Sequence, residues 1–511
     1  MLGYPVPLAM ATQHPDSASR GFTAQDEIEE ALRDLLPPSR GGLGLDEKMV
    51  DYEGKLTPYH QVSWIVEEAL KHGLTPGEDF LITPRIPSER LEEPERQMMV
   101  LWGVIVANKK AIVKAGQEAV RYIINPMSST GYEVYLLQRR IVKLQRLAEE
   151  ELGIKTGRIE VIPLVEDYES LLHVEKILEG ARNALLNHMG LHYSSYRVLL
   201  GKSDTALAYG HLTSSLALVY GISRLYAWAE KENTRVYPII GVGALPFRGH
   251  LAPHSVELFR EQYSGYSTVT IQSGLRYDQG PGAVERVVSG LIDGLHSKPP
   301  RIGLDELKLI TAASRIFTRE YLRVILRVIN TLVDVSRFVP RHRARLSAGE
   351  YPRSLESSIV FTHDPELIKV KPPRTLHIPR AITFAASLYT MGVPPALIGT
   401  GRGLREASRI LGEESVELLV RKLLPLLPVD IEFELQFYAP TIMREYIRDE
   451  KTIELIREDV EVAKSYARKV REPHPEYVSA LLKALEAVRM GVKGEAEKAI
   501  AIAGKMRGSL G

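Results

Sequence analysis

Hydrophobic and polar residues alternate along this chain in two patterns, and each pattern predicts a different element. Long stretches carry apolar residues at every third or fourth position, which is typical of amphipathic helices. The clearest predicted helices cover residues 93–120, 130–152, 303–335 and 474–506. Short apolar runs of strand length lie between such stretches and predict buried strands. These runs are Phe80–Thr83, Ile159–Val165, Tyr196–Leu200, Val236–Val242 and Ser267–Ile271.

The alternation of helical and strand patterns predicts an α/β protein whose parallel strands are buried beneath helices. Both an α/β barrel and a doubly wound sheet satisfy this pattern. The sequence contains no fixed-period repeat, which disfavours a solenoid. The barrel strands are expected roughly between residues 80 and 280, followed by a mostly helical remainder. Beyond residue 430 the pattern is nearly all helical, and it shows no candidate chemistry.

Charged residues follow the predicted strands, at the point where each strand ends. Arg85 follows the first strand, Glu166 and Asp167 the second, Asp204 the third, Arg248 the fourth and Arg276 the fifth. Barrel enzymes place their catalytic groups at the carboxyl ends of the strands. Acidic and basic groups at successive strand ends therefore predict a pocket that holds a cation and an anion together. The alternative interpretation is a set of ordinary loop charges exposed to solvent.

The overall charge balance gives no reason to expect a nucleic-acid or membrane partner. The chain has 65 Lys and Arg against 64 Asp and Glu, a net charge of +1, so it lacks a general attraction for anionic polymers. The most basic stretch, residues 337–354, predicts either a solvated loop or a loop that faces phosphate. A helical interaction protein that binds RNA or an acidic partner through this stretch is the alternative outside enzymes. The lack of interleaved aromatic residues weighs against it.

The absence of cysteine and of targeting segments narrows the class of protein further. Without cysteine, the chain has no disulfide, zinc–thiolate site, iron–sulfur cluster or cysteine nucleophile. Nowhere in the sequence are about 18 consecutive residues apolar, so no membrane-spanning helix is predicted. The apolar segment Met1–Met10 has no basic leader and contains two prolines, unlike a signal peptide. We therefore expect a cytoplasmic protein.

Several common functional motifs are incomplete or absent in this sequence. Gly201-Lys202-Ser203 resembles the end of a phosphate-binding P-loop, but position 196 holds Tyr where that motif needs Gly. The Gly-x-Gly pairs at 241–243 and 399–401 lack the third glycine of a dinucleotide fold. No His-Glu-x-x-His zinc motif and no Gly-x-Ser-x-Gly nucleophile elbow occurs. Nucleotide, nicotinamide and serine-hydrolase functions thus lose their strongest support.

A family resemblance begins near the N-terminus and continues at two strand ends. Ala11-Thr-Gln-His14-Pro15-Asp16 resembles the Thr-x-His-Pro-Thr-Glu signature of phosphoenolpyruvate carboxylases, in the shortened form of the archaeal type. Val161-Ile-Pro-Leu-Val-Glu166 resembles the family's Pro-Leu-Phe-Glu-Thr strand end. Leu200-Gly-Lys-Ser-Asp204 resembles its Gly-Tyr-Ser-Asp-Ser segment. The resemblance implies that Glu166 and Asp204 bind a divalent metal, and two hard oxygen ligands suit Mg²⁺ or Mn²⁺.

Segments that carry arginine extend the resemblance along the chain. Phe80–Arg85 resembles a strand that presents a phosphate-binding arginine, and Gly241–His250 resembles the family's doubled Gly-Arg-Gly-Gly loop. Thr268–Arg276 resembles its Thr-Val-Gln-Gly-Glu-Met-Ile-Arg strand. The segment from Ile378-Pro-Arg380 to Gly401 resembles its Arg-Ala-Ile-Pro segment and the glycine run that follows. The matches keep their order from about residue 11 to residue 401.

The resemblance implies a fold, a reaction and a site. The fold would be one domain of residues 1–511, a (β/α)8 TIM-type barrel elaborated with many additional α-helices. The enzyme would convert phosphoenolpyruvate and bicarbonate to oxaloacetate and phosphate, through carboxyphosphate and a metal-stabilised enolate. His14 would remove the carboxyphosphate proton and Arg248 would orient carboxyphosphate or CO₂, while Arg85 and Arg276 would bind phosphate. Homotetramers are usual in this family.

Two departures from the family pattern limit what the resemblance implies. The Gly-rich loop of the longer enzymes holds two arginines, and the first position here falls around Val242–Ala244. Arg341, or alternatively Arg337, is the candidate substitute on position and charge, so we assign Arg341 to substrate binding. The chain also lacks the Asn-Thr-Gly tail that serves effector binding in the longer enzymes. A metal-dependent lyase of the phosphoenolpyruvate or pyruvate class is the alternative enzyme, although it needs neither His14-Pro15 nor so many arginines.

Overall fold

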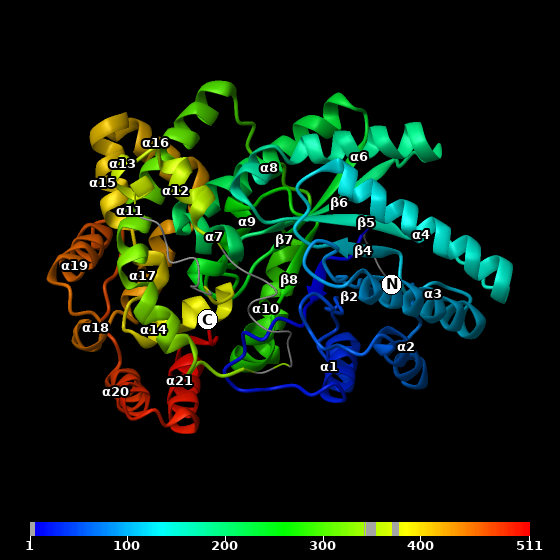
Figure 1. The fold of residues 1–511 in the computed structure, drawn as a ribbon, viewed down its shortest axis with the longest axis horizontal. Helices are drawn as coiled ribbons and strands as arrows, with labels where there is room; N and C mark the ends of the chain where they lie inside the picture. The colour runs from blue at the N-terminus through cyan, green and yellow to red at the C-terminus, as the bar shows by residue number, and fades with distance from the viewer. Residues whose placement is uncertain (1–5, 342, 344–353, 370–377) are drawn as a thin grey trace.

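The computed structural model describes residues 6–341, 343, 354–369 and 378–511. At its centre eight parallel strands run in the order β3-β2-β1-β8-β7-β6-β5-β4 (Figure 1). Their bounds are β1 Ala9–Ala11, β2 Glu47–Lys48, β3 Leu81–Ile82, β4 Tyr122–Asn125, β5 Glu160–Val165, β6 Ser195–Gly201, β7 Arg235–Gly241 and β8 Thr268–Ile271. Most of the basic stretch 337–354, including Arg353, lies outside the described residues.

The sheet closes into a barrel between its two outermost strands. The segment directly after β3 runs beside β4, where the Ile124 backbone N–H donates to the Pro84 carbonyl over 2.8 Å. The Ile86 N–H in turn donates to the Ile124 carbonyl over 3.2 Å. Because closure pairs the outermost strands, no edge is left open along this segment. The structure is thus the elaborated α/β barrel that was predicted, and a doubly wound sheet is excluded.

The five predicted strands are all confirmed, as β3, β5, β6, β7 and β8. The barrel nevertheless begins at Ala9, well before the predicted range of roughly 80–280. Strands β1 and β2 are only three and two residues long. Such short strands carry no readable hydrophobic alternation, since a pattern of period two needs about four residues. Backbone pairing places them in the barrel: Met10 of β1 lies opposite Glu47 of β2 on one side and opposite Thr270 of β8 on the other.

Three of the four predicted helices are confirmed with ends that differ by a few residues. They are α3 Pro94–Ala115, α4 Gly131–Leu152 and α11 Leu304–Ser336. The fourth prediction, residues 474–506, is two helices, α20 Pro475–Met490 and α21 Lys493–Arg507. They separate at Gly491, whose φ of 71° takes the backbone out of the helical region. The amphipathic pattern continues across this turn because each helix buries its own apolar residues, such as Leu481 of α20 and Ile500 of α21.

The remaining helices cover the barrel and build a layer beside it. The first group is α1 Asp26–Leu35, α2 Gln61–Lys71, α5 Tyr168–Leu172, α6 Val174–Met189, α7 Ser203–Tyr209, α8 His211–Lys231, α9 Val256–Gln262 and α10 Pro281–Ile292. The second is α12 Glu356–Thr362, α13 Pro365–Lys369, α14 Ala381–Thr390, α15 Thr400–Leu411, α16 Glu413–Leu423, α17 Leu427–Leu435, α18 Pro440–Tyr446 and α19 Glu450–Lys464. Short turns of helix lie at Pro38–Arg40, Pro246–Arg248, Gly274–Gln279 and Pro395–Leu397.

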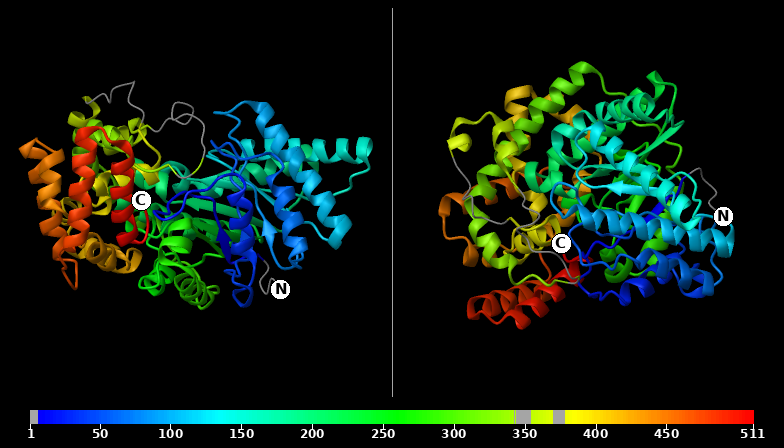
Figure 2. Two further views of the ribbon diagram at one scale, coloured as in Figure 1. Left: turned by 90° about the horizontal axis from the view of Figure 1, so that it is seen from below. Right: turned by 45° about the vertical axis from the view of Figure 1, so that its right-hand side comes forward.

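The C-terminal helices form a layer on one side of the barrel. Helices α11 to α21 lie together on the side opposite to α2 and α3, as the views in Figures 1 and 2 agree. The layer has its own buried apolar core, which includes Leu322, Phe384, Leu388 and Met443. This core also reaches Leu207 of α7. The helical layer therefore packs directly behind the ends of the barrel strands.

The barrel interior combines apolar side chains with one ion pair across the barrel. Arg197 of β6 donates from both terminal nitrogens to the two carboxylate oxygens of Glu47 on β2, each over 2.7 Å. Both side chains are almost fully buried. The guanidinium also lies over the ring of Tyr122, 4.7 Å from its centroid. Burying both charges is tolerated because the bidentate geometry satisfies them together.

Within the described ranges, no single helix is long and apolar enough to cross a membrane. The bent pair Ala381–Thr390 and Pro395–Leu411 reaches that length and composition only when taken together.

We predict that replacing Arg197 with Leu strongly destabilises the fold. The change leaves the Glu47 carboxylate buried without its partner, and loss of one member of a buried ion pair typically costs about 3–5 kcal/mol. The free energy of unfolding, measured by denaturant titration, is the test. The control is Arg301→Ala, because Arg301 pairs with Glu230 in solvent and should change stability by no more than about 0.5 kcal/mol. Equal losses in both variants would contradict the assigned role of the interior pair.

Candidate functional site

A cavity of about 90 Å³ lies where the carboxyl ends of the strands meet. One water needs roughly 10–15 Å³ of such space, so the cavity suits a small substrate rather than a nucleotide. Its lining is His14, Met49, Asp51, Glu53, Lys55, Arg85, Leu164, Glu166, Leu199, Gly201, Ser203, Asp204, Gly241, Arg248, Thr270, Gln272, Arg380, Ala381 and Ile382. Five of the seven predicted site residues are therefore brought together: His14, Arg85, Glu166, Asp204 and Arg248.

Two carboxylates reach the cavity from neighbouring strands. Glu166 directly follows β5 and Asp204 lies in the first turn of α7, just after β6. Strands β5 and β6 pair in register up to Val165 and Leu200. Gly201 gives Glu166 its room, because a Cβ at that position would lie 3.1 Å from the Cβ of Glu166. Over the described residues no group of three or more metal-binding side chains forms. The pairing of β5 with β6 places Glu166 and Asp204 at neighbouring strand ends.

His14 lies just after β1 and is held from both sides. Its Nδ1 is 2.9 Å from the Thr12 hydroxyl oxygen, and its carbonyl accepts a hydrogen bond of 2.5 Å from the Ser273 hydroxyl. Burial and the positive charges of Arg85 and Lys55 lower the pKa of His14 well below its usual value. The imidazole is therefore neutral at pH 7, with one nitrogen able to accept a proton.

Arg85 is fixed by acidic residues that follow β2. Its Nε and Nη2 donate to the two oxygens of Asp51 over 2.8 and 2.7 Å, and its Nη1 lies 2.9 Å from Glu53. Asp51 also pairs with Lys55, whose ammonium donates to the Gln13 carbonyl over 2.7 Å. Burial opposes the charge on Arg85, but Asp51 and Glu53 outweigh it and raise the pKa well above its usual value. The guanidinium is thus a permanent, oriented cation.

Arg248 lies at the end of a short helical turn after β7, and four of the five N–H groups of its guanidinium donate hydrogen bonds. Its Nη1 donates to Asp16 over 3.2 Å and to the Gly511 carbonyl over 2.8 Å. Its Nε donates to the Ser203 hydroxyl over 3.1 Å, and its Nη2 donates to Gln272. Burial lowers the pKa of Arg248, while the Asp16 carboxylate opposes that shift. These contacts leave the guanidinium with one defined orientation at the cavity wall.

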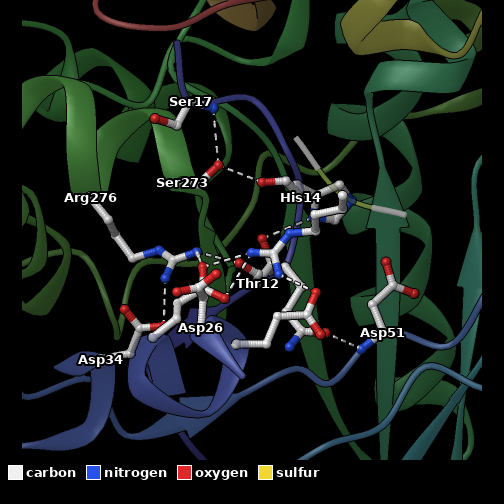
Figure 3. A network of polar contacts seen from close by, with 12 residues as sticks. Thr12, His14, Ser17, Asp26, Asp34, Asp51, Ser273 and Arg276 are labelled. Atoms are coloured by element: carbon white, nitrogen blue, oxygen red, sulfur yellow. Dashed lines mark hydrogen bonds and ion pairs between the residues drawn. The ribbon is translucent and has the colours of Figure 1, made fainter. Parts of the chain in front are cut away.

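Arg276, which was predicted to bind substrate, is not among the described residues that line the cavity. Figure 3 shows it pointing toward α1 instead, between Asp34 and the backbone of Thr12. Its Nη2 also lies 3.0 Å from Glu30. Burial opposes its charge, but Asp34 and Glu30 more than offset this and raise the pKa of Arg276. We therefore revise its role to a support for the segment that carries His14.

Arg341 is likewise absent from the described cavity lining. Its side chain is exposed, as is that of Arg337, which pairs with Asp334 over 3.5 Å. The neighbouring Arg343 is buried and binds Glu30 of α1 through Nη2 over 2.8 Å. No described residue of the basic stretch thus supplies the charge that the Gly-rich loop lacks.

Two cations of the cavity lining were not predicted as site residues. Lys55 follows β2, whose two residues carry no strand pattern, so nothing in the sequence marked its position as a strand end. Arg380 lies at the start of α14 in the helical layer. It belongs to a segment that resembled the family pattern, and that resemblance was the signal that could have identified it. Both are candidates for the charge missing from the Gly-rich loop.

Comparisons with known proteins agree on one family. A family model described as phosphoenolpyruvate carboxylase matches residues 6–511. A phosphoenolpyruvate carboxylase from Methanosarcina mazei is 36% identical over 482 residues, which is 92% of this chain and 90% of the relative. Proteins of the same name from Methanopyrus kandleri and Pyrobaculum arsenaticum are 35% and 34% identical, over 84% and 94% of this chain and 82% and 95% of their own lengths.

We predict that Arg276→Gln lowers stability more than it weakens substrate binding. The change leaves Asp34 and Glu30 buried with less opposite charge, which should cost about 3 kcal/mol, the lower end for a broken buried pair, because Lys48 remains beside Asp34. Denaturant titration and calorimetric titration with phosphoenolpyruvate separate the two effects. The exposed Arg341→Gln should change neither quantity appreciably. A large loss of affinity with unchanged stability would restore Arg276 to the substrate site.

Proposed function

The chain belongs to the phosphoenolpyruvate carboxylase family, and from that membership we propose how it joins phosphoenolpyruvate and bicarbonate to form oxaloacetate and phosphate. The observation that carries the proposal is the cavity at the barrel mouth, where a carboxylate pair, a neutral histidine and several fixed cations meet. A small, doubly anionic substrate and a cation can be held there together. The alternative, another metal-dependent lyase of the phosphoenolpyruvate or pyruvate class, is not favoured by the family comparisons.

The charge of the cavity supports the requirement for a metal. Its described lining holds four acidic residues, Asp51, Glu53, Glu166 and Asp204, and four basic residues, Lys55, Arg85, Arg248 and Arg380. These charges balance, and His14 is neutral, so the protein alone offers little net attraction to an anionic substrate. A divalent cation would make the cavity positive. We therefore propose that a divalent cation and phosphoenolpyruvate bind in the same cavity.

Glu166 and Asp204 would hold this cation. Carboxylate oxygens are the ligands that Mg²⁺ and Mn²⁺ prefer, and Mg²⁺ is typically held by one or two carboxylates with water and substrate completing its shell. Two adjacent carboxylates match that donor set. When bound, the cation would supply positive charge to the oxygen on which negative charge develops as phosphate leaves.

The other lining residues would position the anions and handle one proton. Arg85 and Arg380 present guanidinium groups, which bind phosphate and carboxylate in a forked geometry that lysine cannot match. Arg248, held by Asp16 on one side, would orient carboxyphosphate or the CO₂ that it releases. His14 would accept the carboxyphosphate proton, because it lines the cavity and its neutral ring has one nitrogen that can accept a proton.

We extend the proposal to assembly and location as expectations from the family. The enzyme should form a homotetramer and act in the cytoplasm. Light scattering of the purified protein tests the subunit count directly, and a monomer at micromolar concentration would contradict it.

We predict that the metal and both carboxylates are needed for oxaloacetate formation. NADH oxidation through malate dehydrogenase, with phosphoenolpyruvate, bicarbonate and Mg²⁺, should report activity that EDTA abolishes and added Mg²⁺ restores. Glu166→Gln and Asp204→Asn should each weaken Mn²⁺ binding by at least about 10–100-fold, because even the loss of a residue that only supports a metal ligand has an effect of this size. Electron paramagnetic resonance measures the Mn²⁺ affinity.

The matched control for these variants is Asp167→Asn. Asp167 is adjacent to Glu166, but its carboxylate caps α5 by accepting from the Ser170 N–H over 3.3 Å, and Asn caps helices equally well. Its Mn²⁺ affinity and activity should match those of the wild type. Equal Mn²⁺ affinity in Glu166→Gln and wild type would remove Glu166 from the proposed metal site.

We predict that His14→Asn damages carboxylation far more than substrate binding. Loss of an acid–base group typically lowers the rate by about 10²–10⁴-fold. An enolate that forms but fails to capture CO₂ picks up a proton, so the variant should release pyruvate and phosphate in a bicarbonate-dependent reaction. Coupling to lactate dehydrogenase measures pyruvate, and coupling to malate dehydrogenase measures oxaloacetate. A folded variant with a normal product ratio would exclude His14 from the proton transfer.

The pH dependence of the wild type tests the same role. A base acts in its unprotonated form, and the lowered pKa keeps His14 unprotonated as the pH falls through 6.5. The acid-side decrease in kcat/KM should therefore lie below pH 6.5. A decrease centred at pH 6.5 or above would show that another group limits the reaction.

A further inference from the structure

A buried carboxylate behind the cavity contacts two segments that lead to it. Asp430 on α17 is only 3% exposed. One of its oxygens lies 2.6 Å from Nδ1 of His250, and the other lies 3.0 Å from Nε2 of His211. His250 comes two residues after Arg248, and His211 begins α8 just beyond the short helix that carries Asp204. One side chain of the helical layer therefore holds both segments at once.

The pattern of hydrogen bonds determines which nitrogens carry protons. Burial raises the pKa of Asp430, while the hydrogen bond from His211 opposes that shift. In its ionised form Asp430 only accepts, so Nδ1 of His250 and Nε2 of His211 are then the donors. Nε2 of His250 is then an acceptor, 3.0 Å from Nε2 of His254. Burial lowers the pKa of His250 to about 3, which keeps the ring neutral with one donor and one acceptor. Each ring nitrogen of His250 thus has a partner.

The backbone at His250 needs such an anchor. Gly249 has a φ of 121°, and a Cβ there would lie 2.3 Å from a methyl carbon of Val242, so a side chain does not fit. His250 itself has a φ of 58°, a left-handed conformation that residues other than glycine seldom adopt. Strained residues of this kind persist where their surroundings fix them. For His250 the fixing contacts are the hydrogen bonds of its ring and those of its backbone, where its carbonyl accepts from the Ser255 hydroxyl.

The same turn sets the position of Arg248. The Arg248 carbonyl accepts from the Gly243 N–H over 2.8 Å, while its own N–H donates to the Leu245 carbonyl over 2.9 Å. The His250 N–H donates to that same Leu245 carbonyl over 3.0 Å. A change in the backbone of His250 would therefore alter the turn and move the arginine at the cavity wall.

We propose that Asp430 is a positioning residue for the carboxylation step, which acts by anchoring His250 and so aiming Arg248 into the cavity. Asp430 contacts no substrate itself. The inference rests on the proposed role of Arg248 in orienting carboxyphosphate or CO₂. Because that role follows substrate binding, loss of the anchor affects CO₂ capture and leaves phosphoenolpyruvate binding nearly intact.

The test compares His250→Gly, Asp430→Ala and the double variant. Glycine removes the imidazole ring but adopts the left-handed backbone without strain. The His250→Gly variant therefore tests the loss of the ring contacts without adding backbone strain. Each single variant should lower the ratio of oxaloacetate to pyruvate by at least tenfold, since a catalytic group misplaced by about 1 Å can cost 10²-fold. The KM for phosphoenolpyruvate should change by less than about threefold. Both single variants lose the contact between His250 and Asp430, so the effect of the double variant should fall well short of the sum of the two single effects.

The matched control is Glu434→Gln, one turn farther along α17. Glu434 accepts a hydrogen bond of 2.6 Å from the Tyr389 hydroxyl on α14, and burial raises its pKa to about 8, so neutral Gln is a close replacement. Its product ratio should equal that of the wild type even if its thermal midpoint falls. Glu434→Gln thus reports any general effect of disturbing this helix.

Two outcomes would overturn the inference. A lower thermal midpoint in His250→Gly and Asp430→Ala with an unchanged product ratio would make the anchor purely structural. If Glu434→Gln lowered the ratio of oxaloacetate to pyruvate by the same factor, the effect would belong to α17 as a whole. A wild-type enzyme that makes no oxaloacetate from phosphoenolpyruvate is a different result, because it removes the proposed function and this inference with it.

Discussion

The pairing of charges in places that water does not reach is the constraint on which the rest of this structure depends. A buried charge is stable only when an opposite charge and enough hydrogen bonds surround it. Glu47 and Arg197 satisfy this rule inside the barrel, and Asp51 and Arg85 satisfy it at the barrel mouth. A cavity that collects charged side chains is therefore also a cavity whose side chains are held rigidly.

Rigid pairing has a direct consequence for catalysis. A guanidinium already fixed by a carboxylate loses little freedom when substrate arrives, so its orientation is prepared before binding. Arg85 with Asp51, and Arg248 with Asp16, are prepared in this way. Burial and the same cations lower the pKa of His14, so one arrangement of charge serves both the binding of anions and the proton transfer that we propose.

The barrel and the helical layer each contribute residues to the site. Parallel strands place Glu166 and Asp204 side by side, because their carboxyl ends share one end of the barrel. The helical layer contributes Arg380 to the lining and Asp430 to the support behind it. The sequence around Asp430 did not indicate any chemistry, since a single buried aspartate on a helix has no recognisable motif. Its meaning comes only from the two histidines that the fold brings to it.

The sequence by itself determined the strands with several consecutive apolar residues, most of the long helices and the charged residues that end those strands. The local sequence pattern was sufficient for these elements, because the periodicity of apolar residues along a short segment indicates both the type of element and its buried side. Only the tertiary structure decided where Arg276 points, that β1, β2 and β4 belong to the barrel, and that Lys55 and Arg380 reach the cavity. Arg276 and Arg85 both follow a strand, yet one meets Asp34 and Glu30 of α1 while the other meets the cavity. The difference arises from partners far apart in the chain, and a sequence pattern read over a short window contains no information about them.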